Sequence, residues 1–478
     1  MKLNKVRTKN LVGTLIVVSL LGIILGLRWK TWFSNLPELL YTTPDSITRL
    51  TVVPGQRMCR DVTITWRAGV KLVDGWADVT RLTKDSLNRI VYLTDKKRYK
   101  AKKQLVPSRG GIDVYYHVAL KDLQPGGNYK VVVHTKSASN SDSTIVHMPN
   151  EDKPLNFLYL GDIQDISDRI AKERMNYIKP ILKEMDFTLQ IGDLIERPMN
   201  TYWNLVYNSC GELFKKQFIA TPGNHEVIKG LIKRIDPRWR AQFNFPINGP
   251  ISQLGLSYYV DHPYCRFISI NSNNVDLPWQ LYDQLKWLEQ TLKSATQPFI
   301  IVFMHHAVKP VRSTRTHPIM FHMIRPLLEK YHVDLVLQGH DHSYARTTHP
   351  DEDKKVDFTP PVYVISTFSS KCYENGFSRA FDRMGSGIAF YSKIKITKTK
   401  IQYEAFTFDG KPTDRFALVR EDRDPKLSRT NAKDALFIDQ TGNLPEYLLF
   451  NQFGNSKKAR ERREAYKEAV KKRYSQRN

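Results

Sequence analysis

The sequence contains few cysteines and fewer acidic than basic residues. Its four cysteines form no Cys-x-x-Cys pair, which argues against a thiolate metal site of that spacing. They could form disulfides in an exported chain, in three connectivities, or they could be buried thiols, so both alternatives stay open. Asp and Glu number 48 against 73 Lys and Arg, which gives a formal net charge of +25. That balance favours anionic partners, such as phosphate esters, nucleic acid, acidic lipid or a wall polymer.

No recognisable nucleic-acid-binding module occurs in the sequence, so nucleic-acid recognition is disfavoured as the main role. The chain has 478 residues, more than one ordinary domain requires, which predicts two domains with additional segments. Hydrophobic residues make up 41% and charged residues 25% of the chain, a composition typical of a globular protein with a large core.

An uncharged apolar run, Leu11 to Leu27, lies between basic residues at the amino terminus. As a helix it would be roughly 25 Å long, near the lower limit for crossing a bilayer. No Ala-x-Ala-like cleavage site follows it, which favours an uncleaved anchor over a signal peptide. We therefore predict a transmembrane helix within a membrane anchor over residues 1–30. The basic residues before the run favour a cytoplasmic amino terminus, with the rest of the chain exported to the periplasm or the cell exterior.

Residues 45–148 contain short strand-like segments without convincing helices. The segment Asp61–Trp66, for example, alternates polar and apolar residues, and turn signals separate it from the segments that follow. Regular short strands of this kind predict an all-β sandwich of the immunoglobulin or fibronectin type. The turn Leu123-Gln-Pro-Gly-Gly-Asn-Tyr129 resembles the tyrosine-bearing corner of fibronectin type III modules.

After a polar linker over residues 137–152, strand-like and helix-like segments alternate. This alternation is typical of an α/β domain, which we predict over residues 153–420. Residues 421–478 form a basic tail, and the stretch 456–478 is predicted to be an exposed helix with a thin apolar stripe. We interpret the tail as a solvated helix held by charge pairs, with contact to an anionic surface as the alternative.

Five apolar runs in the α/β region end in residues that bind hard metal ions well. Each run is interpreted as a buried strand, because it is short, rich in β-branched and aromatic residues, and bounded by turn residues. The loops at the carboxyl ends of the strands form the functional crevice of an α/β sheet, so these residues should converge. They are Asp162, Asp193, Asn224, His305, His340 and His342.

This set of oxygen and nitrogen donors predicts a site for two divalent metal ions, with Mn, Fe or Zn as candidates. Two such ions bind a shared hydroxide and clamp a phosphoryl group for in-line attack, which indicates a metal-dependent hydrolase. His225, next to Asn224, is predicted to stabilise the transition state or to protonate the leaving alkoxide. The neighbouring Glu226 has a simpler interpretation, which is to orient the turn.

The motifs occur in a fixed order: Gly-Asp162, Gly-Asp193, Gly-Asn224-His225-Glu226, His305-His306 and Gly-His340-Asp-His342-Ser-Tyr-Ala-Arg346. This ladder resembles that of the calcineurin-like metallophosphoesterases. Together with the preceding fibronectin-like module, it is most similar to the purple acid phosphatases over roughly residues 45–420. The resemblance implies a four-layer α/β/β/α sandwich of two mixed sheets after the N-terminal β-sandwich.

The resemblance also implies a role for each site residue. The implied roles are Asp193 as the bridge between two metal ions, Asp162 and His342 as ligands of the first ion, Asn224, His305 and His340 as ligands of the second, and His225 beside the substrate phosphate with His306 or His317 as a further contact. We predict His225 and His306 as catalytic residues, with His317 and Arg315 as candidate substrate contacts.

Two positions depart from the family pattern. Gln164 stands where the family has glycine, and Glu196 stands where the purple enzymes have the tyrosine that binds Fe(III) and gives the colour. Both side chains are candidates for extra metal ligands or for groups that support the ligands. The missing phenolate predicts a colourless enzyme that uses divalent ions.

The predicted function is metal-dependent hydrolysis of phosphate monoesters, as in acid phosphatases, with a metal-bridging hydroxide as the nucleophile. One alternative is a phosphodiesterase that acts on nucleotides, lipid head groups or anionic polymers. An alternative of another class is a non-catalytic binding protein on a phosphatase scaffold, which only the changes at Gln164 and Glu196 favour.

Overall fold

The structure is a computed structural model. It describes residues 2–475 except for the stretches 85–89, 93–95, 166–167, 231, 276, 314, 352–360, 422–433 and 449–455.

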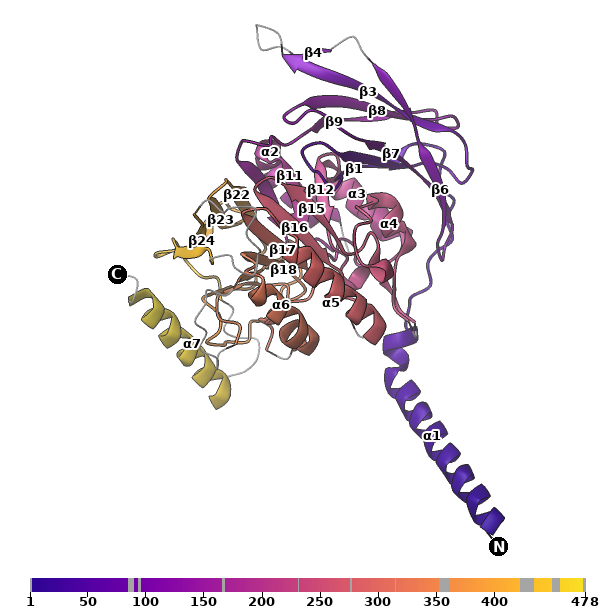
Figure 1. The fold of residues 1–478 in the computed structure, drawn as a ribbon, viewed down its shortest axis with the longest axis vertical. Coiled ribbons are helices and arrows are strands. Elements are labelled where there is room, and N and C mark those ends of the chain that lie inside the picture. The colour runs from indigo at the N-terminus through magenta and orange to yellow at the C-terminus, as the bar shows by residue number, and fades with distance from the viewer. Residues whose placement is uncertain are drawn as a thin grey trace.

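The first element is the helix α1 (Lys2–Phe33), which projects away from the rest of the molecule (Figure 1). Among the described residues, no helix combines the length and the apolar character that are needed to cross a bilayer. The predicted membrane anchor over residues 1–30, and with it the transmembrane helix, is therefore wrong. The physical reason is length: the apolar run ends at Leu27, and its roughly 25 Å fall short of a hydrocarbon core of about 30 Å. The prediction of export rested on this anchor and loses that support.

The region predicted as a β-sandwich consists of strands in two sheets. The strands are β1 (Thr48–Pro54), β2 (Val62–Arg67), β3 (Gly75–Lys84), β4 (Ile90–Tyr92), β5 (Lys97–Lys100), β6 (Lys102–Pro107), β7 (Ile112–Leu120), β8 (Asn128–Thr135) and β9 (Asp142–His147). Their alternating apolar side chains, Trp66, Val131 and Val133 among them, form one buried cluster between the sheets. The Tyr129 hydroxyl accepts a hydrogen bond from the Gln124 amide at 2.9 Å, as a tyrosine corner requires.

One sheet of this module continues into the following domain. Strands β1, β2, β7 and β6 extend an 11-stranded sheet whose order is β25-β24-β23-β22-β10-β11-β12-β1-β2-β7-β6. The junction is a parallel pairing of β1 with β12, at Val52 and Gln217. The remaining strands are β10 (Leu155–Leu160), β11 (Phe187–Gln190), β12 (Gln217–Ala220), β22 (Phe390–Ile396), β23 (Lys400–Thr407), β24 (Pro412–Val419) and β25 (Leu436–Asp439).

A second, seven-stranded sheet faces the first. Its order is β15-β16-β17-β18-β20-β19-β21, and β16, β17, β18 and β20 are mutually parallel. Its strands are β15 (Tyr258–His262), β16 (Cys265–Ile270), β17 (Phe299–Met304), β18 (Leu335–Gln338), β19 (Tyr344–Thr347), β20 (Val362–Ile365) and β21 (Arg383–Gly385). Phe157 and Phe187 from the first sheet contact the ring of Phe267 from the second edge-on, with centroids 5.6 and 5.3 Å apart.

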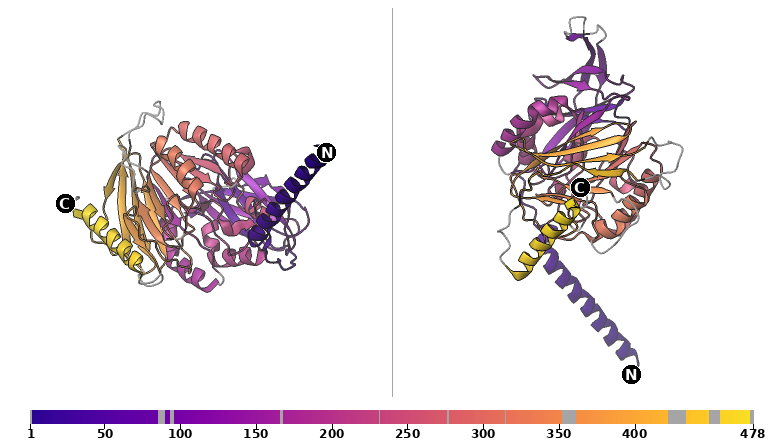
Figure 2. Two further views of the ribbon diagram at one scale, coloured as in Figure 1. Left: turned by 90° about the horizontal axis from the view of Figure 1, so that it is seen from below. Right: turned by 90° about the vertical axis from the view of Figure 1, so that its left-hand side faces the viewer.

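Helices cover the outer faces of these two sheets (Figures 1 and 2). The helices are α2 (Asp168–Glu184), α3 (Asn200–Phe214), α4 (Pro237–Phe243), α5 (Pro278–Lys293), α6 (Arg325–Lys330) and α7 (Lys457–Ser475), and the short elements are η1 (Asn224–Glu226), η2 (Ile251–Gln253), η3 (Met320–Ile324), β13 (Val227–Ile228) and β14 (Arg234–Ile235). Leu288 and Leu292 of α5, for example, pack with Ile300 of β17 in a buried cluster outside the second sheet. All four cysteines are free thiols, so the disulfide alternative is wrong for this structure.

The segment between α1 and β1 is held to the domain by a buried ion pair. The Arg238 guanidinium lies 2.5 Å from Glu38 Oε1, and the two side chains are 0% and 2% exposed. Asp236 binds the same guanidinium at 2.8 Å. Glu38 also accepts a hydrogen bond from the Asn200 amide at the start of α3, at 2.6 Å.

Replacing Glu38 by Ala is expected to destabilise the protein by about 3 kcal/mol, because the buried Arg238 guanidinium loses one of its two carboxylate partners. Asp236 still neutralises part of its charge, so the expected loss is at the lower end for a broken buried ion pair. Urea unfolding of the whole chain measures this change. The exposed Glu184→Ala serves as a control and should alter the unfolding free energy by less than about 0.5 kcal/mol. Equal stability of the two variants would contradict a structural role for the pair.

Candidate metal centre

Six polar side chains meet at one edge of the paired sheets. Each follows the carboxyl end of a strand: Asp162 follows β10, Asp193 follows β11, Asn224 follows β12, His305 follows β17, and His340 and His342 follow β18. Because the strands are parallel within each sheet, their carboxyl ends lie at the same edge. The convergence predicted from the sequence is present in the structure.

Two groups of three donor side chains occur among the described residues. Asp162, Asp193 and His342 form one group, and His305, His306 and His340 form the other; within each group the donor atoms all lie within 4.8 Å of one another. The groups are adjacent, since His305 Nε2 lies 3.2 Å from Asp193 Oδ2. Asn224 Oδ1 lies 3.0 Å from the same His305 Nε2.

The backbone is strained at three of these residues. Asp193, His340 and His342 have φ angles of 54°, 71° and 46°, which are unusual for residues other than glycine. Such conformations cost about 1–3 kcal/mol each and persist where the surrounding structure imposes them, typically at functional sites.

Glycine is required at the turn beside Asp193. A Cβ atom on Gly223 would lie 2.1 Å from Asp193 Oδ1, and Gly192 has a φ of 92°. Any larger residue at either position would therefore displace the Asp193 carboxylate or strain its loop.

Glu226 joins the two loops that carry Asp193 and Asn224. Its carboxylate is fully buried and accepts four backbone hydrogen bonds, from the amides of Gly223, Asp193, Leu194 and Ile195 at 2.7, 3.0, 2.8 and 3.2 Å. These contacts agree with the interpretation that Glu226 orients the turn.

Hydrogen bonds fix the orientation of the imidazoles. His305 donates from Nδ1 to the Ile191 carbonyl at 3.0 Å, because a carbonyl can only accept. In the neutral ring this leaves the Nε2 lone pair directed at Asp193 and Asn224. His342 Nδ1 lies 2.9 Å from Ser369 Oγ, which leaves Nε2 facing Asp162 at 3.3 Å. Contacts of this kind set the tautomer and direction of metal-binding histidines.

Burial dominates the electrostatics of the cluster. It raises the pKa of Asp162 to about 7, with the charge of Asp193 adding to the effect. Burial also lowers the pKa of His342 to about 3 and holds the pKa values of His306 and His340 well below the usual range. These imidazoles are therefore neutral, which is the form that binds metal ions.

His305 and Asp193 are the exception to this trend. Burial lowers the pKa of His305, but the charge and hydrogen bond of Asp193, together with the charge of Asp162 and the Ile191 carbonyl, outweigh burial and raise that pKa to about 9. Burial likewise opposes ionisation of Asp193, yet His305 and His225 hold the pKa of Asp193 below its usual range. Protonated His305 thus carries a positive charge next to Asp193, at the position where a bound metal ion would supply one.

Gln164 lies beside the first donor group. Its Nε2 atom is 3.0 Å from His342 Nε2, and its Oε1 atom is buried with no hydrogen-bond partner among the described residues. A buried amide oxygen without a partner is costly, and a cation would satisfy it. The site therefore fits a metal ion, with Gln164 as a candidate ligand.

Glu196 does not join the donor groups. Its carboxylate pairs with Lys371, with Nζ 2.5 Å from Oε2, and its main-chain carbonyl accepts a hydrogen bond from His225 Nδ1 at 2.6 Å. The residue at the colour-giving tyrosine position thus forms an ion pair and positions His225 through its backbone.

His306, predicted as catalytic, belongs to the second donor group, and His317 and Arg315, predicted as substrate contacts, lie beside that group. The ring of His306 lies 4.4 Å from that of His340 and 5.1 Å from that of His317, between centroids. Ser272 holds His306, with Oγ 2.7 Å from Nδ1. Arg315 is committed to the loop itself, since its Nη1 donates to the His340 carbonyl and to Asp341 Oδ1, at 2.5 and 2.7 Å.

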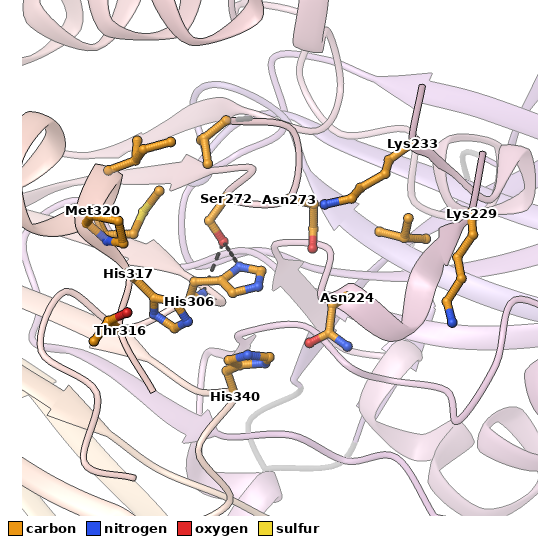
Figure 3. A pocket seen from close by; sticks show the side chains of 14 residues that line it. Asn224, Lys229, Lys233, Ser272, Asn273, His306, Thr316, His317, Met320 and His340 are labelled. Atoms are coloured by element: carbon orange, nitrogen blue, oxygen red, sulfur yellow. Dashed lines mark hydrogen bonds between the residues drawn. The ribbon is translucent and has the colours of Figure 1, made fainter. Parts of the chain in front are cut away.

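A cavity of about 390 Å³ opens beside the second donor group. Figure 3 shows His306, His317 and His340 at one side, Lys229 and Lys233 at the other, and Asn224 between them. The lysines and Ser272 were not identified from the sequence. For Ser272 a signal existed: β16 also ends in a polar run, Asn271-Ser-Asn-Asn274, at the same edge of the sheet.

Comparison with known proteins identifies the domain. Residues 155–344 match the family model described as calcineurin-like phosphoesterase. The chain contains a calcineurin-like phosphoesterase domain. The resemblance predicted from the motif ladder is confirmed, and the domain together with its relatives makes the chain a metallophosphoesterase, a phosphoric ester hydrolase.

The curated relatives of this metallophosphoesterase include plant enzymes. Purple acid phosphatase 4 of Arabidopsis thaliana is 24% identical, over 56% of this chain and 84% of the relative. Probable purple acid phosphatase 20 of the same plant is 27% identical, over 44% of this chain and 50% of the relative. The structure of a phosphatase from Mycoplasma pneumoniae is similar with 14% identity and a TM-score of 0.30, over 60% of this chain and 94% of that chain.

Proposed function

We propose that this metallophosphoesterase hydrolyses phosphate monoesters with two divalent metal ions. The observation that carries the proposal is the position of Asp193, which belongs to one donor group and lies 3.2 Å from His305 of the other. A carboxylate between two groups of donors suits a bridging ligand, because each of its two oxygens can face one ion. Neutral imidazoles and the unsatisfied Gln164 oxygen support metal binding on either side of it.

The proposed ligands are drawn from the two donor groups and from two neighbouring amides, Gln164 and Asn224, while His306 of the second group is assigned to the substrate phosphate. Asp162, His342 and Gln164 would hold the first ion, Asn224, His305 and His340 would hold the second, and Asp193 would be shared by both. When bound, such ions supply Lewis-acid charge for the phosphoryl oxygens and an activated water as nucleophile. Mn, Fe and Zn all suit this donor set.

His225 is proposed to protonate the leaving group. Its Nδ1–H group donates a hydrogen bond to the Glu196 carbonyl, and its backbone amide donates to Asp193 Oδ1 at 2.8 Å. These two bonds fix the ring beside the Asp193 carboxylate. With Nδ1 committed, the ring donates a proton from Nε2 only as imidazolium, and it returns to the neutral form as the alkoxide departs.

His306 is proposed to bind the substrate phosphate from the other side of the cavity. Its backbone amide and Nδ1 both contact Ser272 Oγ, at 3.0 and 2.7 Å, which leaves Nε2 for a phosphoryl oxygen. The adjacent His317 is held in the same way, because its Nδ1 donates to the Ala307 carbonyl at 2.8 Å. Both rings are thus fixed before substrate arrives, which favours the transition state.

Metal analysis combined with substrate kinetics tests this function. Protein stripped with a chelator and reloaded with Mn, Fe or Zn is expected to bind two ions per chain and to hydrolyse an aryl phosphate faster than the matched bis(aryl) phosphate. His225→Ala should lower kcat for the monoester by about 10²-fold or more. His349→Ala, which lies outside the centre, is the matched control. A faster reaction with the diester would favour the phosphodiesterase alternative, and one ion or none per chain would contradict the proposal.

The iron-loaded protein is expected to show no tyrosinate charge-transfer band. Glu196 occupies the position of the colour-giving tyrosine and is paired with Lys371, so no phenolate is supplied there. Visible absorption spectra of the metal-free and Fe(III)-loaded protein test this. A band in the loaded protein would point instead to Tyr373, whose ring centroid lies 4.8 Å from that of His342.

A further inference from the structure

A second cavity adjoins the one beside the metal centre. It has a volume of about 710 Å³. Thr316, His317 and Pro318 line both cavities, so this short segment forms their common wall. A substrate whose phosphate sits near His306 and His340 could therefore extend past His317 into the second cavity.

The second cavity is basic. Its lining includes Lys309, Arg312, Arg315, Arg379 and Arg462, and none of the described residues that line it is acidic. Asp341 neutralises Arg315 through an ion pair of 2.7 Å. Arg312 instead lies over the ring of Tyr373, 4.3 Å from its centroid, which fixes the guanidinium without cancelling its charge. Several like charges around a concave surface attract anions strongly.

The carboxyl-terminal helix α7 completes this cavity. Arg462 and Ala465 of α7 line it, although they are more than 100 residues from the loop that contains Lys309 and His317. Tyr466 fixes the helix: its side chain is 1% exposed, its hydroxyl donates to Glu446 Oε1 at 2.5 Å, and its ring packs with Phe377. Figures 1 and 2 show α7 lying against the domain. The helix predicted to be solvated therefore has one face docked beside the catalytic loops.

We propose that this second cavity is a subsite for an anionic leaving group, and that the preferred substrates are phosphate esters whose leaving group carries a second phosphate. This inference rests on the proposed function for the reaction itself. The reacting phosphate occupies the cavity beside the metal centre, and the second phosphate is held by Arg312 and Arg462 across the His317 wall. Arg462 is then a specificity-determining residue supplied by the tail, which otherwise has no part in the reaction.

A series of alkanediol bisphosphates and the matching alkyl monophosphates tests the subsite. The metal-loaded whole chain is expected to show a higher kcat/KM for a bisphosphate than for the monophosphate of equal chain length, by about tenfold at the best-fitting length. Arg462→Glu should lower this preference about tenfold, since it reverses a charge at the subsite. Arg460→Glu makes the same charge change at an exposed position of α7 outside the cavity and should preserve the preference.

Equilibrium binding separates the subsite from the reaction. Alkane bisphosphonates cannot be hydrolysed, so their affinity relative to monophosphonates reports on the second cavity even in an inactive protein. Tighter binding of the bisphosphonate that Arg462→Glu abolishes and Arg460→Glu retains would support the subsite. Equal affinity for both ligands, or equal effects of the two variants, would overturn it even if monoesters are hydrolysed. Inactivity towards every ester together with selective bisphosphonate binding would overturn the proposed function alone.

Discussion

Replacing Asp193 by Asn is expected to abolish phosphate ester hydrolysis while leaving the fold intact. Loss of a single hydrogen-bond donor in an active site costs about 10²–10³-fold in rate, and loss of the charged ligand proposed to be shared by both ions should cost at least about 10³-fold. Asn has the same shape as Asp and keeps one oxygen. That oxygen can still accept the hydrogen bond that the His225 amide donates to Asp193 Oδ1, at 2.8 Å in the native protein. What disappears is the negative charge beside His305 and between the two proposed ions.

The same substitution should reduce metal binding. With one charge removed from a cluster of two carboxylates, at least one ion is expected to be lost in equilibrium dialysis at micromolar metal. Asp122→Asn is a matched control, because that carboxylate is 74% exposed and pairs with Arg57 and not with a donor residue of the centre. Metal content, kcat and the unfolding midpoint are compared for both variants. An Asp193→Asn protein that keeps two ions and most of its activity would show that another residue bridges them.

The donor residues were predictable because their signals are local. An apolar run followed at once by Gly-Asp or His-His marks both a strand and its end, and the parallel arrangement then brings those ends together. Asp162, Asp193 and His305 required nothing more than this. Glu226 was also within reach, because its place directly after Asn224 and His225 limits it to the same turn.

Partners supplied from distant loops could not be predicted. Lys371 pairs with Glu196 across 175 residues of sequence, and nothing around either residue indicates that contact. The continuation of the first sheet through β1 and β12 is equally non-local, since it depends on how two otherwise separate sheets align. The ion pair affects the chemistry of the site and the strand pairing affects its shape. Both depend on contacts that form only when distant segments meet in the folded chain.

The two terminal helices show how hydropathy alone misleads. The run in α1 was interpreted as an anchor from its apolar composition, although its length is marginal for that role. The strongly charged α7 was interpreted as solvated, although Tyr466 is buried against Phe377. One buried aromatic residue is enough to pack a polar helix against a domain. A short apolar stripe in the sequence does not show which surface the helix packs against.

Replacing Glu226 by Ala is expected to destabilise the protein by about 3–5 kcal/mol, because it strands four buried backbone donors that each cost roughly 1–3 kcal/mol when unpaired, and water can satisfy some of them. Since total stability is typically about 5–15 kcal/mol, this variant could remain largely unfolded, so Glu226→Gln is measured beside it. Gln keeps the volume and one acceptor, but its NH₂ group faces backbone amides that also donate.

These two variants separate stability from positioning. Glu226→Gln should fold, yet it should weaken metal binding by about 10–100-fold, because its single oxygen can accept from only one pair of backbone amides and its NH₂ group opposes the other pair, which loosens the loops of Asp193 and Asn224. Urea unfolding gives the stability and a competitive chelator titration gives the metal affinity, with the exposed Glu212→Ala as control. Unchanged metal affinity in a folded Glu226→Gln protein would mean that the two loops hold their geometry without the buried carboxylate. The strained backbone at Asp193 argues against that outcome, because a conformation of this kind needs its surroundings to impose it.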